Sequence, residues 1–81
     1  MIINYNGKIY AGTPYEIFDE LRAYAFSKKT LSVEEYIEFT CDNYYKMQGI
    51  RPELKSVDTI EKCRELIGIL SEVSVIHILK A

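Results

Sequence analysis

The polar and apolar residues divide this chain into six predicted elements, and the first two form a hairpin. Short apolar runs at residues 2–5 and 8–11 flank Asn6-Gly7. An Asn-Gly pair tolerates the positive φ angles of a type I′ turn, and such a turn fixes the register of the two strands that it joins. We therefore expect Tyr5 to lie opposite Lys8 and Ile3 to lie opposite Tyr10.

Three helices are predicted by their start signals. Thr13, Ser32 and Asp58 can each accept a hydrogen bond from the first turn of a helix, and a glutamate follows three residues later each time. Apolar residues recur at helical spacing over 14–27, 33–48 and 59–70. The predicted buried stripes comprise Ile17, Phe18, Leu21, Tyr24 and Ala25 in the first helix; Val33, Ile37, Thr40, Cys41, Tyr44 and Met47 in the second; and Ile60, Cys63, Leu66, Ile67 and Leu70 in the third.

The last element is predicted to be a strand over residues 73–79. This run is dominated by β-branched residues, which favours a strand, and the main alternative is that it continues the third helix. Val73, Val75 and Leu79 would face one way and Ile76 and Ile78 the other. Both faces would then be apolar, as in a strand that is covered on two sides. Residues 50–57 show no periodicity and are predicted to be a connecting loop.

These elements indicate a single α+β domain over residues 1–81. The order strand, strand, helix, helix, helix, strand (ββαααβ) predicts a small three-stranded sheet with the helices mainly on one face. Because the hairpin joins the first two strands, the last strand is expected beside the first, in the order 2-1-3. A chain of 81 residues buries only about 60 to 65% of the surface of its unfolded form, so burial in an oligomer would add to a modest core.

Charge and hydropathy limit the possible partners. The formal net charge is -2, and Lys28-Lys29 is the only basic pair, so direct binding to nucleic acid is not expected. No apolar stretch approaches the roughly 18 residues that span a bilayer, and the first residues lack the basic segment of a secretion signal. We therefore expect a cytoplasmic protein that does not associate with a membrane.

The residues that most often carry chemistry are few. Cys41 and Cys63 lie in different predicted helices and are expected to be reduced, buried thiols, because neither belongs to a C-x-x-C pair. His77 is the only histidine. It could act as a general base, but the simpler interpretation is a partly buried ring that makes one hydrogen bond. No spacing among these three residues matches a zinc site, so we expect no catalytic residue, no metal and no cofactor.

An excess of tyrosine favours a role in protein interaction. Seven of the residues are tyrosine and none is tryptophan, and tyrosine provides a large amphipathic contact area. Phe39 lies outside the stripe of the second helix, toward its acidic side. The leading hypothesis is a small non-enzymatic interaction module that forms a homodimer through its C-terminal strand. The candidate contact residues are Tyr5, Tyr10, Phe39, Tyr45, Val75, Ile76, His77 and Ile78.

An acidic surface supports a second hypothesis. Glu34, Glu35, Glu38 and Asp42 share one side of the second helix. They could bind a nucleic-acid-processing protein by imitating phosphates, which would make this chain an inhibitor. The simpler interpretation is a solvated helix face.

Overall fold

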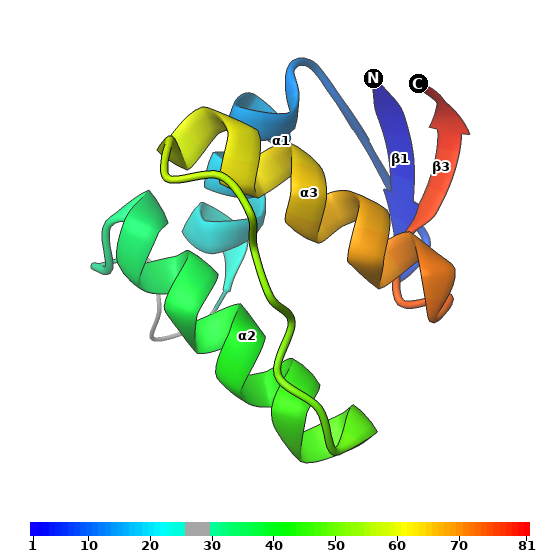
Figure 1. Cartoon of the computed structure of the whole chain (residues 1–81). Coiled ribbons are helices and arrows are strands. Elements are labelled where there is room, and N and C mark those ends of the chain that lie inside the picture. Colours follow the sequence, from blue (N-terminus) through cyan, green and yellow to red (C-terminus); the bar gives the residue numbers. More distant parts are fainter. Residues whose placement is uncertain (26–29) are drawn as a thin grey trace.

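The structure of the protein is a computed structural model, and it describes residues 1–25 and 30–81 (Figure 1). It contains β1 (Ile2–Tyr5), β2 (Lys8–Ala11), α1 (Pro14–Tyr24), α2 (Val33–Gln48), α3 (Thr59–Glu72) and β3 (His77–Lys80). The strands form one antiparallel sheet in the order β2-β1-β3. The predicted α+β class, element order and strand order are confirmed.

The hairpin forms as its turn predicts. Asn6 and Gly7 have φ angles of 52° and 80°, and the amide of Gly7 donates to Oδ1 of Asn4 at 3.1 Å. Tyr5 pairs with Lys8 and Ile3 pairs with Tyr10, as expected. The two positive φ angles explain why asparagine and glycine occupy this turn.

The helix starts are also confirmed. Thr13 and Ser32 each accept from the third amide of their helix at 3.1 Å, and Glu16 and Glu35 accept in return from the two cap amides at 2.9 Å. These hydrogen bonds lower the pKa of both glutamates. Asp58 caps α3 by accepting from the amide of Glu61. Unlike Glu16 and Glu35, Glu61 pairs through its carboxylate with the guanidinium of Arg64.

Helix α1 is shorter than predicted. It ends at Tyr24, and Ala25 has an extended backbone with its amide bonded to the carbonyls of Leu21 and Arg22. The expected end at Ser27 is therefore too late, and Ser27 itself lies outside the described residues. At the other end of the chain α3 continues to Glu72, two residues beyond the predicted end.

The predicted strand over residues 73–79 is wrong in its first half. The amides of Val75 and Ile76 both donate to the carbonyl of Leu70, and Ser74 has a φ angle of 63°, so residues 73–76 form a turn that ends α3. β3 begins only at His77, and all four of its residues are exposed. It is therefore not a strand that is covered on both faces.

The core lies between the sheet and the helices. Ile3 and Tyr10 contribute from the inner face of the hairpin, and Ile76 joins them from the turn before β3. The pattern of burial confirms that the helices cover one face of the sheet, since Ile9 on the other face is exposed. The buried residues are Ile3, Tyr10, Ile17, Phe18, Leu21, Val33, Ile37, Cys41, Cys63, Leu66, Ile67, Leu70 and Ile76.

Helix α2 packs against α1 and α3, on the side of the helices away from the sheet (Figure 1). Residues 49–57 return from its C-terminal end to α3 without helix or strand, as predicted. Glu65 of α3 holds this loop by accepting from the amides of Lys55 and Ser56 at 2.8 and 2.9 Å. Hydrogen bonding from the Ser56 side chain, and then from these amides, lowers the pKa of Glu65. Among the described residues, none of the helices combines the length and apolar character needed to cross a membrane.

Candidate functional site

Helix α2 carries a buried apolar stripe and a second stripe of mixed apolar and polar residues. Val33, Ile37 and Cys41 are buried in the core. A second stripe follows the helix at spacings of four, three and four residues, through Tyr36, Thr40, Asn43 and Met47. Residues at this spacing share one face of a helix, and this face borders a groove instead of the core.

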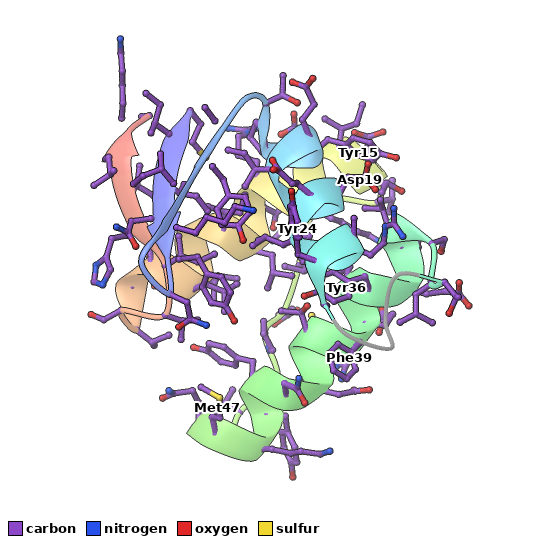
Figure 2. All side chains as sticks on the ribbon, turned by 180° about the vertical axis from the view of Figure 1, so that it is seen from behind. Tyr15, Asp19, Tyr24, Tyr36, Phe39 and Met47 are labelled. Carbon is purple, nitrogen blue, oxygen red and sulfur yellow. The ribbon has the colours of Figure 1, made fainter. Side chains whose placement is uncertain are left out.

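The groove has a volume of about 340 Å³. Its walls come from α1, α2, α3, β1 and the turn before β3, so we call it the α2 groove. Figure 2 shows Tyr36, Phe39 and Met47 following one another along α2, below the end of α1. The described residues that line the groove are Tyr5, Phe18, Leu21, Ala25, Tyr36, Phe39, Thr40, Asn43, Tyr44, Met47, Leu70, Val75 and Ile76.

Three aromatic rings form the end of the groove that is nearest to the N-terminus of α2. The ring centroids of Phe18 and Tyr36 lie 5.1 Å apart with an interplanar angle of 54°, and those of Tyr36 and Phe39 lie 5.8 Å apart at 27°. Burial raises the pKa of Tyr36, and the neighbouring Tyr5 and Tyr10 raise it further. The hydroxyl of Tyr36 therefore remains protonated at neutral pH and can donate a hydrogen bond.

The described lining contains no charged side chain. Its polar groups are tyrosine hydroxyls, the Asn43 amide and the Thr40 hydroxyl, which already donates to the carbonyl of Tyr36 at 2.8 Å. Pockets with this composition bind mainly apolar groups and use a few polar contacts to orient them. The far end of the groove is open, since Met47 is 63% exposed.

Two lysines lie beside the groove. Lys8 is the cross-strand partner of Tyr5, and its Nζ lies 3.4 Å from the ring centroid of Tyr24 at the end of α1. This cation–π contact holds Lys8 next to the wall formed by α1 and β1. Lys46 follows Asn43 by three residues and is therefore next to it on the surface of α2, outside the lining of the groove.

The groove contains four of the eight contact residues predicted from the sequence. Tyr5, Phe39, Val75 and Ile76 all line it. Tyr10 instead belongs to the core at 6% exposure, and Tyr45 is exposed outside the lining. The two remaining candidates, His77 and Ile78, lie in the exposed strand β3.

Sequence reasoning missed part of the lining. It assigned Thr40, Tyr44 and Met47 to the buried stripe of α2, and it gave no role to Tyr36 or Asn43. The assignment of Met47 to the buried stripe is wrong, because α2 extends beyond the elements that cover it. The spacing of the second stripe could have indicated a second apolar face, but not whether another element covers that face.

The groups with potential chemistry lie apart from one another. The prediction that His77 is partly buried is wrong, since it is exposed on β3. Cys41 and Cys63 are buried free thiols, as predicted, and burial raises the pKa of Cys63 to about 12. Within residues 1–25 and 30–81, no three histidine, cysteine or acidic side chains gather as metal ligands would.

The four carboxylates of the predicted acidic surface are engaged within the chain. Glu34 accepts from Nζ of Lys62 at 2.5 Å and from the Thr59 hydroxyl at 2.7 Å, and its pKa is lowered chiefly by the hydrogen bond from Lys62. Glu35 belongs to the cap of α2. The guanidinium of Arg51 bridges the last two, Glu38 and Asp42, and so fastens the loop to α2.

Comparison with known proteins identifies no relative: no family model matches the chain, and no curated protein or solved structure matches it.

Proposed function

We propose that this protein is a small non-enzymatic protein-interaction module, and that its α2 groove binds apolar side chains of a partner protein. The observation that carries the proposal is the open end of the groove, where Met47 is 63% exposed beside a pocket of about 340 Å³ with an aromatic and aliphatic lining. Apolar surface of this kind gains free energy when a partner removes it from water. Aromatic anchors in such pockets commonly dominate the energy of an interface.

The lining favours binding over catalysis. Its hydroxyl groups lie among apolar rings, and burial raises the pKa of Tyr36, so this hydroxyl is suited to donating a hydrogen bond and not to acting as a base. The two thiols are buried, which makes them unreactive. We also propose that the protein is cytoplasmic, a compartment in which such free thiols stay reduced.

Site-specific crosslinking tests the proposed contact. A photo-reactive phenylalanine analogue is placed at Met47 in the groove or at Val57, which is exposed in the loop outside the groove. After illumination of the native cells, we expect a protein adduct from the Met47 position and not from the Val57 position. Asn43→Arg, which introduces a charge into the lining, should abolish that adduct. Equal adducts from both positions would refute the proposal.

A second surface favours self-association. Ile9 and Leu79 are 53% and 57% exposed; Ile9 lies on the face of the sheet away from the helices, and Leu79 lies in β3 at the register shift opposite Ile2 and Ile3. We propose that two copies pair through this face and β3 about a two-fold axis, the commonest symmetry of homo-oligomers. Ile76 is buried, so of the predicted strand residues only His77 and Ile78 remain as contacts alongside Leu79.

Light scattering tests the homodimer. We expect a dimer at tens of micromolar for the wild type, a folded monomer for Leu79→Lys, and a dimer for the control Val57→Lys, which adds the same charge away from the sheet. A monomeric wild type would exclude this pairing and would leave the groove proposal unaffected.

The acidic-inhibitor hypothesis has less support. Arg51 and Lys62 offset much of the charge on Glu34, Glu38 and Asp42, which weakens any imitation of phosphates. Charge reversal at Glu35 and Glu38 would abolish inhibition of a nucleic-acid-processing partner and would leave an apolar interaction intact. We propose no direct contact with nucleic acid or membrane.

A further inference from the structure

We infer that the element bound in the α2 groove is an amphipathic α-helix of a partner protein, with acidic residues flanking its apolar stripe. This inference rests on the proposed function and specifies the partner. Three features of the groove carry it: the hydrogen-bonding groups of its walls, its length along α2, and the charge on its two sides.

The walls favour a helix over an extended segment. The backbone groups of α1 and α2 are bonded within their own helices over most of the groove, and no strand edge is among the described lining residues. An extended peptide would therefore lose hydrogen bonds from water without gaining a strand partner. A helix satisfies its own backbone and presents only side chains, as in other helix-in-groove complexes.

The length of the groove fits about two helical turns. Phe39 to Met47 spans eight residues of α2, or about 12 Å at the helical rise. A partner helix lying along this stretch would place apolar residues at positions i, i+3 or i+4, and i+7 against Phe39, Asn43 and Met47. Tyr36 would contact one end of it.

The two sides of the groove are positive. Lys8 lies beside the β1 side of the groove and Lys46 beside its α2 side, both outside the lining, and neither takes part in the ion pairs found among the described residues. Asp42 and Glu38 are the carboxylates of α2 that lie closest in sequence to Lys46, and Arg51 holds both of them. A helix with a glutamate or aspartate on each side of its apolar stripe would complement both lysines, which gives specificity in addition to apolar contact.

A second copy of this chain fits the groove less well. Its most acidic helix is α2, whose Glu34, Glu35, Glu38 and Asp42 are engaged by groups of their own chain. Binding through them would require these contacts to break. The expected occupant is therefore a different protein, and concentration-dependent dimerisation that is lost in Met47→Lys would contradict this.

Fluorescence anisotropy with three labelled peptides tests the inference. Each peptide has about 16 residues, or about four helical turns. The first has a leucine stripe flanked by glutamates, the second has the same stripe flanked by lysines, and the third has the composition of the first with the stripe scrambled. The proteins are the wild type, the groove variant Lys46→Glu, and the control Lys55→Glu, which makes the same charge change in the loop outside the groove.

We expect the glutamate-flanked peptide to bind the wild type most tightly. An exposed ion pair contributes up to about five-fold in affinity, so Lys46→Glu should weaken the binding of this peptide by about five-fold and should narrow its advantage over the lysine-flanked peptide. Lys55→Glu should leave both affinities unchanged. The preference should shrink as salt is added, because exposed charges are screened.

The contradicting results separate the two proposals. If both striped peptides bind equally well and the scrambled peptide does not, the acidic partner is refuted and the apolar groove is retained. If a fourth peptide, the glutamate-flanked one with a proline in the middle of its stripe, binds with unchanged affinity, the helical partner is refuted. If no striped peptide binds better than the scrambled one, the inference fails, and the crosslinks at Met47 then decide whether the proposed function fails with it.

Discussion

The ring of Tyr36 packs against the ring of Phe18, with their centroids 5.1 Å apart. Figure 2 shows Tyr36 near the end of α1, with Phe39 and Met47 farther along α2. Val33, Ile37 and Cys41 face the core along α2, and the face that carries Tyr36, Phe39 and Met47 borders the groove. Along this second face, burial decreases from Tyr36, which packs against Phe18, to Met47, which is 63% exposed. One end of the groove face is therefore structural, and its other end is available for binding.

That division predicts different costs for two substitutions on one stripe. Tyr36→Ala removes a half-buried ring that contacts Phe18 and should lower the free energy of unfolding by about 2 kcal/mol. Met47→Ala alters an exposed side chain and should change the free energy of unfolding by no more than about 0.5 kcal/mol. Urea unfolding measures both. Equal losses would mean that the stripe is not divided in this way.

Two glycines provide a matched test of the hairpin turn. Gly7 has a positive φ of 80° and open space where a Cβ would lie, so Gly7→Val should destabilise the fold by about 1 kcal/mol or more through backbone strain alone. Gly68 also has open space but lies within α3, so Gly68→Ala should stabilise the fold by up to about 1 kcal/mol. Melting curves for the two variants should move in opposite directions. An unchanged melting curve for Gly7→Val would contradict the turn.

Acid should unfold the protein through its bonded glutamates. Hydrogen bonds lower the pKa of Glu16, Glu34, Glu35 and Glu65 in the folded state from the usual 4.5. Their contribution to stability is therefore present above pH 4.5, and it is lost as the pH falls through the lowered pKa values of the folded state. The melting temperature should be constant from pH 7 to about pH 5 and fall below that. Glu65→Gln should reduce the size of the fall, and a melting temperature unchanged at pH 3 would contradict the predicted role of these carboxylates.

The turn before β3 predicts opposite outcomes for two neighbouring isoleucines. Ile76 is 1% exposed, so Ile76→Lys would bury a charge without a partner and should prevent folding. Ile78 is 38% exposed, so Ile78→Lys should leave the circular dichroism spectrum of the folded chain unchanged. A folded Ile76→Lys variant would show that the turn is placed wrongly.

The parts of the fold that could be predicted from the sequence depend on short-range contacts. The caps at Thr13 and Ser32 each connect residues three apart, and the Asn6-Gly7 turn depends on the φ angles of its own two residues. Periodicity then identified most of the core. The start of β3 was missed because Ser74, which is not a glycine, has the positive φ of the turn, and the β-branched residues on both sides of it gave no sign of this.

The groove could be predicted only in part, because it depends on how separate elements meet. Tyr5 and Phe39 were identified as candidates from residue type alone, but nothing near either residue in the sequence indicates that they line the same groove. Their proximity follows from the end of α1 at Tyr24 and from the position of α2 on α1 and α3. Met47 was assigned to the core for the same reason, since periodicity identifies an apolar face without showing what covers it.

The most direct test of the groove is a titration of the ¹⁵N-labelled chain with the glutamate-flanked peptide, followed by amide chemical shifts. We expect the largest shifts at Tyr5, Phe39, Asn43 and Met47, with Ile9 and Leu79 in the sheet unchanged. Shifts centred on Ile9 and Leu79, with the amides of α2 unchanged, would contradict the proposal that this protein recognises its partner through the α2 groove.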